Sequence, residues 1–114
     1  SIRHKWATFL AKNARGIDAE REFRTALDQR PFHAEAASNL GFLLAQRQAY
    51  REAEEWLRQA VERNPLYARA RMNAIQNLVA QGRWSDALVA LDQAERLLPL
   101  NPEVQQASKL LRQR

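Results

Sequence analysis

The stretch from Ala37 to Pro65 reads ASNLGFLLAQRQAYREAEEWLRQAVERNP and contains two amphipathic segments on either side of a short polar break. In the first segment, small or apolar residues recur at i, i+3, i+4 and i+7, the spacing of one helix face: Ala37, Leu40, Gly41 and Leu44. The second segment restarts the same stripe with Ala53, Leu57, Ala60 and Val61. The stretch therefore predicts a pair of helices, and Asn64–Pro65 ends the second one because a residue before proline disfavours helical geometry.

The same pattern returns at a constant interval along the whole chain, as the even spacing of three prolines shows, and we call this interval the repeat period. Five sets of three positions, each separated by the repeat period, carry the same residue type or a close apolar substitute; we call each set a column. They are Pro31, Pro65, Pro99; Leu10, Leu44, Leu78; Ala19, Ala53, Ala87; Phe23, Leu57, Leu91; and Ala26, Ala60, Ala94. The alternation of small and large residues is typical of closely packed helix pairs, in which a large side chain fills the space between two near backbones. The chain is a repeat array.

We expect one domain over residues 1–114, with units at about 1–33, 34–67 and 68–101 and a capping helix at about 102–114. The last helix has a plausible N-cap in Asn101 and a proline at its first position. Its apolar side (Val104, Ala107, Leu110, Leu111) suits a helix that closes the stack. The predicted helices cover 2–13, 18–29, 34–47, 50–63, 68–80, 84–97 and 102–112.

Composition limits the function classes. The 114 residues are 46% hydrophobic and 27% charged, as in ordinary globular domains, and no apolar run is long enough for a membrane span. Cysteine is absent, which fits a reducing cytoplasm, slightly favoured, or a disulfide-free periplasmic domain. The chain begins with Ser rather than Met, so we expect it to be part of a longer protein. Metal-binding, phosphate-binding and nucleophile motifs are all missing from the sequence, which predicts no catalysis, no metal and no cofactor.

The net charge of +5, carried mostly by arginine, raises an acidic partner or a nucleic acid as candidates. Much of this charge is expected to be paired locally, because acid and arginine stand at i and i+4 on three predicted helices. These pairs are Glu20–Arg24, Glu54–Arg58 and Asp92–Arg96.

The motif Leu40-Gly41-x2-Leu44, followed by Ala53-x3-Leu57-x2-Ala60 and Pro65, resembles the tetratricopeptide repeat (TPR), a helix-turn-helix unit of about 34 residues. The first and third units match the second half of this motif. The resemblance implies an all-α, right-handed solenoid that acts in protein–protein interaction, with an inner groove lined by the first helix of each unit. The third unit departs from the motif at Ala74-Ile75, which replace Leu40-Gly41 in inverted order of size.

Helical spacing assigns candidate groove residues. Amides can pair with an extended peptide backbone, Phe42 and Met72 can make apolar contacts, and the cations favour a carboxylate. The candidates are Lys5, Lys12, Asn39, Phe42, Arg69, Met72, Asn73 and Gln76. Some members of the family hold chaperone tails with a carboxylate clamp of Lys, Asn, Asn, Lys and Arg. The matching positions here are His4, Thr8, Asn39, Arg69 and Asn73, and three of them depart from that pattern, which argues against such a clamp but leaves other acidic or C-terminal peptides open.

Two further hypotheses remain. Binding of RNA or single-stranded nucleic acid is the alternative function, disfavoured because only one aromatic residue, Phe42, lies on the predicted groove, and the other aromatic residues are better explained by helix packing. At the N-terminal end, Ile2 and Phe9 match Ala36 and Leu43, which should contact a preceding unit. Since no unit precedes Ile2 in this chain, these two side chains predict an interface with an upstream segment, another domain or a second copy of the chain.

Overall fold

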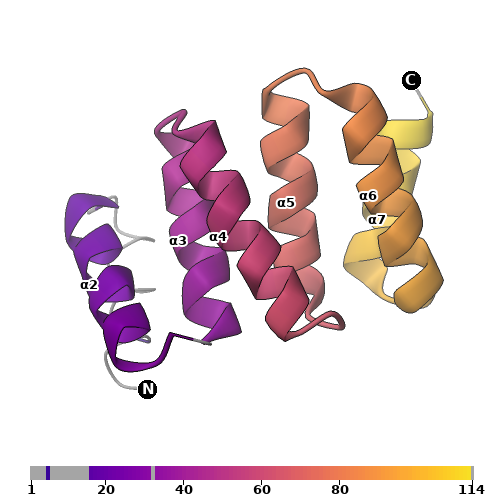
Figure 1. Ribbon diagram of the computed structural model, residues 1–114. Coiled ribbons are helices and arrows are strands. Elements are labelled where there is room, and N and C mark those ends of the chain that lie inside the picture. The colour runs from indigo at the N-terminus through magenta and orange to yellow at the C-terminus, as the bar shows by residue number, and fades with distance from the viewer. Residues whose placement is uncertain (1–4, 6–15, 32, 114) are drawn as a thin grey trace.

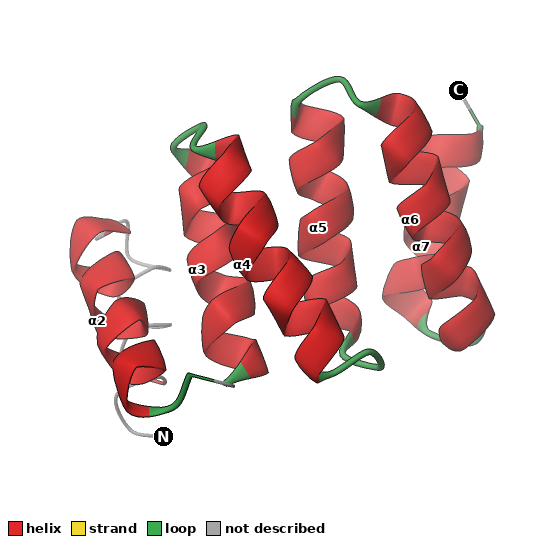
Figure 2. Cartoon of the chain, in the orientation of Figure 1, coloured by secondary structure: helices red, strands yellow, loops and turns green. Residues whose placement is uncertain are grey.

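The computed structural model describes residue 5, residues 16–31 and residues 33–113, and all of its regular elements there are α-helices joined by short turns (Figures 1 and 2). They are α2 (Gly16–Gln29), α3 (Ala34–Gln46), α4 (Tyr50–Arg63), α5 (Ala68–Ala80), α6 (Trp84–Leu97) and α7 (Pro102–Arg112). Lys5 is helical, and the rest of the first predicted helix lies outside the described residues. The described helices match the predicted ones within two residues at each end. Gly16, expected as a break between helices, is the first residue of α2.

Local chemistry explains several helix ends. The side chain of Asn101 accepts hydrogen bonds from the backbone N–H groups of Glu103 (2.9 Å) and Val104 (3.1 Å), which confirms its predicted role as an N-cap. His33 caps α3 in the same way, because its Nδ1 accepts from the N–H of Ala36 at 3.2 Å. Gly82 between α5 and α6 has a φ of 73°, a left-handed conformation that glycine adopts without steric cost.

The helices form two layers. The first helices of the units are α3, α5 and α7: α3 is a neighbour of α5, and α5 is a neighbour of α7. The second helices α4 and α6 each pack on the first helix of their own unit and of the next one, and α2 packs on α3. Figure 1 shows the helices following one another in chain order along the molecule. This is the all-α helical-repeat architecture that the repeat period predicts.

The repeating small and large residues form the core. The alanine columns are buried at every described position, and so are Phe23, Leu57 and Leu91 between them. One buried cluster joins α2, α3, α4 and the start of α5, and a second, which includes Val104, joins α5, α6 and α7. Trp56 and Tyr67 pack against the first cluster as expected. Trp84 differs from that expectation, because its side chain is 39% exposed on α6.

Gly41 sets how closely α3 and α4 approach. A Cβ atom at this position would lie 2.5 Å from Cγ of Leu57, 2.8 Å from its Cδ2 and 3.2 Å from the carbonyl oxygen of Ala53. In the next unit Ile75 stands in place of this glycine, and α5 and α6 approach each other over less of their length than α3 and α4. The inversion of size at Ala74-Ile75 thus coincides with a less extensive contact between the two helices of the third unit.

The ion pairs differ in part from the expected ones. Glu20–Arg24 and Asp92–Arg96 form within their helices, at 3.1 and 3.2 Å. The Glu54–Arg58 pair is wrong: Arg58 pairs with Glu55 and Glu62, which lie one turn before and one turn after it on α4. Glu54 instead forms an ion pair with Arg83, from the turn of the next unit, with 2.9 Å between Nη1 of Arg83 and Oε1 of Glu54.

We predict that Gly41→Ala destabilises the protein. Alanine favours a helix interior over glycine by about 1 kcal/mol, but the clash with Leu57 should cost about 1–3 kcal/mol, so the free energy of unfolding falls. Chemical denaturation measures this change. In a Leu57→Ala background the clash with the leucine side chain is removed, and the same Gly41→Ala change should then destabilise the protein much less. Equal effects in both backgrounds would contradict the proposed contact.

Candidate functional site

One position of the repeat is exposed on all three first helices. It is occupied by Phe42 of α3, Gln76 of α5 and Leu110 of α7, and the exposed fractions of Phe42 and Leu110 are 38% and 67%. Because α3, α5 and α7 are successive neighbours, the three side chains form a row across one face, which we call the first-helix face. Two large apolar side chains in this row are not used by the core, which makes the face a candidate contact surface.

Leu110 is a candidate site residue that the apolar pattern of α7 alone does not identify. The sequence placed it on the packed side of the capping helix, together with Val104, Ala107 and Leu111. Val104 is buried, and Ala107 and Leu111 pack against the second core cluster, but Leu110 points away from it into solvent. The signal that finds it is the repeat period, since Leu110 continues the column of Phe42 and Gln76.

A row of alternating charges lies at the start of the same helices. Glu35, Arg69 and Glu103 occupy equivalent exposed positions of α3, α5 and α7, and Nε of Arg69 lies 3.4 Å from a carboxylate oxygen of Glu103. Arg69, predicted as a cation for a ligand carboxylate, is thus already paired within the protein. Exposed pairs of this kind contribute little to stability, so a ligand carboxylate can compete with Glu103.

Tyr67 stands just before α5, next to these charges. Burial raises the pKa of its hydroxyl, the carboxylates of Glu35 and Glu103 add to the rise, and Arg69 opposes it. The hydroxyl therefore stays protonated at neutral pH. It can donate a hydrogen bond at the end of the face where the charges lie.

Asn73 has a different place from the one expected for a ligand-binding amide. Its side chain is only 5% exposed, and its Nδ2 donates to the Oγ of Ser38 at 2.9 Å and to the carbonyl oxygen of Ser38 at 3.3 Å. The donors of Asn73 thus hold α5 against α3 instead of remaining open to a peptide. Met72 is also buried, which corrects its placement as an open apolar contact.

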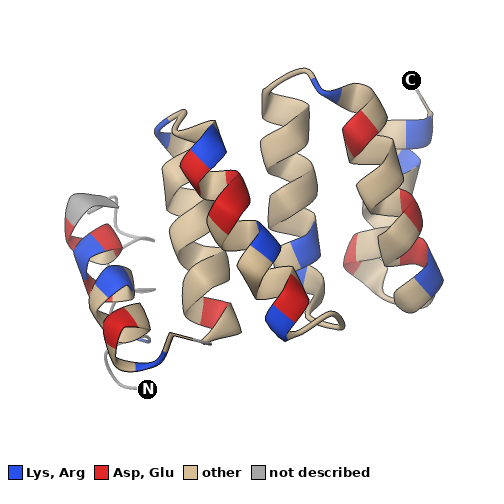
Figure 3. Cartoon of the chain, viewed as in Figure 1, with Lys and Arg blue, Asp and Glu red and all other residues tan. Residues whose placement is uncertain are grey.

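The remaining candidates are distributed as follows. Lys5, Phe42, Arg69 and Gln76 are exposed, and Asn39 is half-buried. Lys12 and the two residues of the predicted N-terminal interface, Ile2 and Phe9, lie outside the described residues. Figure 3 shows that charged residues crowd α2, α4 and α6, whereas α3 and α5 carry theirs mainly at one end. Over α3 and α5, the first-helix face is accordingly less charged than the second helices are.

Two observations on the described residues concern metal sites and membrane-spanning helices. No group of three or more His, Asp or Glu side chains there is placed to hold a metal ion. Among the helices described, none combines the length and the apolar character that crossing a bilayer requires.

Comparison with known proteins agrees with this geometry. Two models of the tetratricopeptide repeat match the sequence, one over residues 10–68 and the other over residues 49–111. No curated protein gives a significant match. Solved structures match across nearly the whole chain, although their sequence identities are low.

The first tetratricopeptide repeat domain of Spaghetti (RPAP3), bound to an HSP90 peptide, has a TM-score of 0.86 at 17% identity, over 98% of this chain and 91% of that one. The TPR2B domain of yeast Sti1, in complex with an Hsp70 peptide, has a TM-score of 0.84 at 20% identity over the full length of both chains. The translocator chaperone SycD of Yersinia enterocolitica has a TM-score of 0.85 at 17% identity, over 97% and 77%. Each family model covers more than half of the chain, and together they span its repeats: the chain belongs to the tetratricopeptide repeat family.

Proposed function

We propose that this chain is a non-catalytic protein-interaction module that binds an extended peptide across the first-helix face. The observation that carries the proposal is the row of Phe42, Gln76 and Leu110, in which apolar side chains flank an amide on three neighbouring helices. An extended peptide suits such a row because the amide can bond its backbone while the apolar residues contact its side chains. Two similar structures, of Spaghetti and of Sti1, were solved with chaperone peptides.

The charges beside the row favour an acidic group near the start of the helices. Arg69 is the cation of this region, and it is held by one exposed carboxylate, that of Glu103. A peptide carboxylate that reaches Arg69 would replace one ion pair by another, with a bidentate guanidinium contact as the gain. The proposed ligand is therefore a peptide with an acidic or C-terminal carboxylate at this end and apolar side chains along the row.

The apolar part is tested with a displayed library of random peptides selected on the wild-type protein. Phe42→Ser and Leu110→Ser should each weaken the selected peptides by about tenfold, the loss expected when a well-buried apolar anchor is removed. Val89→Ser is the matched control, because Val89 is an exposed apolar residue on α6, in the other layer. Peptides that bind all three variants as tightly as the wild type would contradict the assignment of the face.

The charged part is tested on the acidic members of that selection. Arg69→Ala should weaken them by about tenfold or more, since a hydrogen bond to a charged group is worth about 1.5–3 kcal/mol. Glu103→Gln should raise the affinity for these peptides, because it removes the internal carboxylate that pairs with Arg69. Calorimetric titration measures both changes. Loss of affinity in both variants, or in neither, would show that Arg69 does not bind the peptide.

The N-terminal interface is a separate proposal, and it rests on the sequence pattern of Ile2 and Phe9. If a second copy of the chain covers these residues, replacing both with Glu should abolish a concentration-dependent dimer in sedimentation and leave the helical content unchanged. A wild-type chain that remains monomeric at high concentration would contradict the dimer.

A further inference from the structure

A second candidate site lies on the side of α5 away from the first-helix face. A cleft of about 310 Å³ opens between α4, α5 and α6. Its walls are mainly apolar, and polar side chains surround them. The apolar lining consists of Leu57, Val61, Ala74, Leu78 and Ala90. This volume is at the lower end of the range of ligand sites, about 300–1,000 Å³, and accommodates one or two apolar side chains.

The cleft has a cause in the sequence of the third unit. Ala74 occupies the position of Leu40 in the unit before, where the larger side chain is fully buried. Ile75 occupies the position of Gly41, and α5 and α6 contact each other less extensively than α3 and α4 do. The smaller residue at position 74 leaves space in the wall that the larger Leu40 fills in the second unit.

The cleft also contains a cation that has no counterion among the described residues. Arg71 lines it, is only 8% exposed, and donates from Nε to the carbonyl oxygen of Pro65 at 2.7 Å. None of the described carboxylates lies within ion-pair distance of Arg71, and burial lowers the pKa of its guanidinium. Buried charges are normally paired, because desolvation without compensation is costly. The equivalent residue of the second unit is Ala37, so the repeat itself does not require an arginine here.

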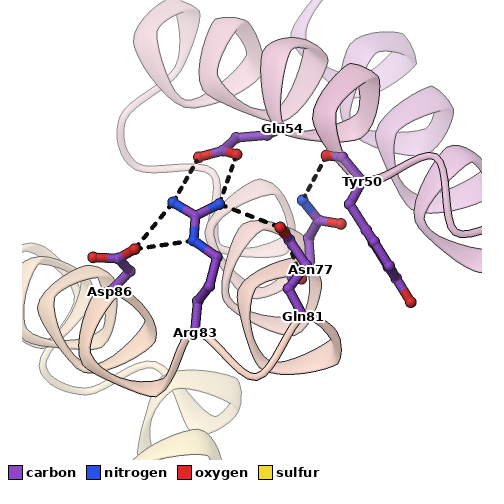
Figure 4. A network of polar contacts seen from close by, with 6 residues as sticks. All are labelled: Tyr50, Glu54, Asn77, Gln81, Arg83 and Asp86. Carbon is purple, nitrogen blue, oxygen red and sulfur yellow. Dashed lines mark hydrogen bonds and ion pairs between the residues drawn. The ribbon is translucent and has the colours of Figure 1, made fainter.

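Asn77 adds an unsatisfied acceptor to the same lining. Its Nδ2 donates to the carbonyl oxygen of Tyr50 at 3.2 Å, as Figure 4 shows, but its buried Oδ1 has no hydrogen-bond donor among the described residues. The equivalent residues of the neighbouring units are Leu43 and Leu111. An amide with an orphaned oxygen in a column of leucines is unfavourable for packing alone.

We propose that this cleft binds a peptide segment that inserts an apolar side chain between α4 and α6 and places a carboxylate against Arg71. The other charges of the lining are already engaged: Glu54 with Arg83, and Arg58 with Glu62. Arg71 is therefore the cation available to an incoming anion. Gln93, an exposed residue of α6, supplies an amide group that matches the N–H and C=O groups of a polypeptide, which favours a peptide over a free amphiphile.

The test uses the isotope-labelled 114-residue chain in NMR titrations. The probe is a short peptide with blocked, uncharged termini, in which glycine and serine residues flank a central leucine-aspartate pair. A version with asparagine in place of aspartate and a version with alanine in place of leucine are compared with it. Saturable shifts are expected at the backbone amides of Ala74 and Ala90, and both altered peptides should bind at least about tenfold more weakly.

Two variants locate the site on the protein. Ala74→Leu installs the residue of the preceding unit, so it should fill the cleft, retain the fold and abolish binding. Arg71→Met removes the charge but keeps the aliphatic length, and it should erase the difference between the aspartate and asparagine peptides without lowering the melting temperature. Leu100→Ser is the control, because Leu100 is an exposed apolar residue between α6 and α7 that belongs to neither candidate site, and it should leave this titration unchanged.

Several results would overturn the proposal. They are the absence of saturable shifts with the leucine-aspartate peptide, binding that survives Ala74→Leu, and shifts confined to α3 and the exposed side of α5. Octanoate serves as a free carboxylate of the same chemistry. Saturation by octanoate without saturation by the peptide would reject a peptide as the occupant of the cleft.

Discussion

The close approach of two helix backbones within each unit is the constraint on which the rest of this structure depends. Alanine columns on the second helices and Gly41 on α3 remove the side chains that would hold the helices apart, and one large residue such as Leu57 fills the remaining space. Once the pair is docked, the rotation of each helix about its axis is determined. This packing leaves one face of α3, which carries Phe42, exposed to solvent. Because the unit repeats, the equivalent faces of α5 and α7 lie beside it, with Gln76 and Leu110.

Helix bounds could be predicted to within two residues because the signals are local: apolar spacing, a proline after each unit and the Asn101 cap. The site was less predictable, since a helical wheel shows the direction of a side chain but not how deeply a neighbouring helix buries it. Asn39 and Asn73 share one column, yet Asn73 is closed off by Ser38 of the adjacent unit. Likewise the partner of Arg69, Glu103, belongs to the following helix and cannot be read from either helix by itself.

Two ion pairs of this chain join successive units of the second-helix layer. Arg24 reaches from α2 to Glu52 of α4 at 2.7 Å, and Arg83 reaches from the third unit back to Glu54. Figure 4 shows the guanidinium of Arg83 held between Glu54 and Asp86. Arginine suits these positions because its planar fork can serve two carboxylates at once.

Three departures of the third unit from the second lie in one cleft. Arg71, Ala74 and Asn77 replace Ala37, Leu40 and Leu43, and their combined effect is a buried cation, a cavity and an amide oxygen with no donor among the described residues. Each of these changes alone is unfavourable for packing. An array selected only for stability would keep the residues of the second unit, which satisfy the same geometry one repeat earlier. Violations of local packing that converge on a single cleft are what a binding site requires, because the energy forgone in the free protein is recovered when a ligand fills the space and pairs the charge.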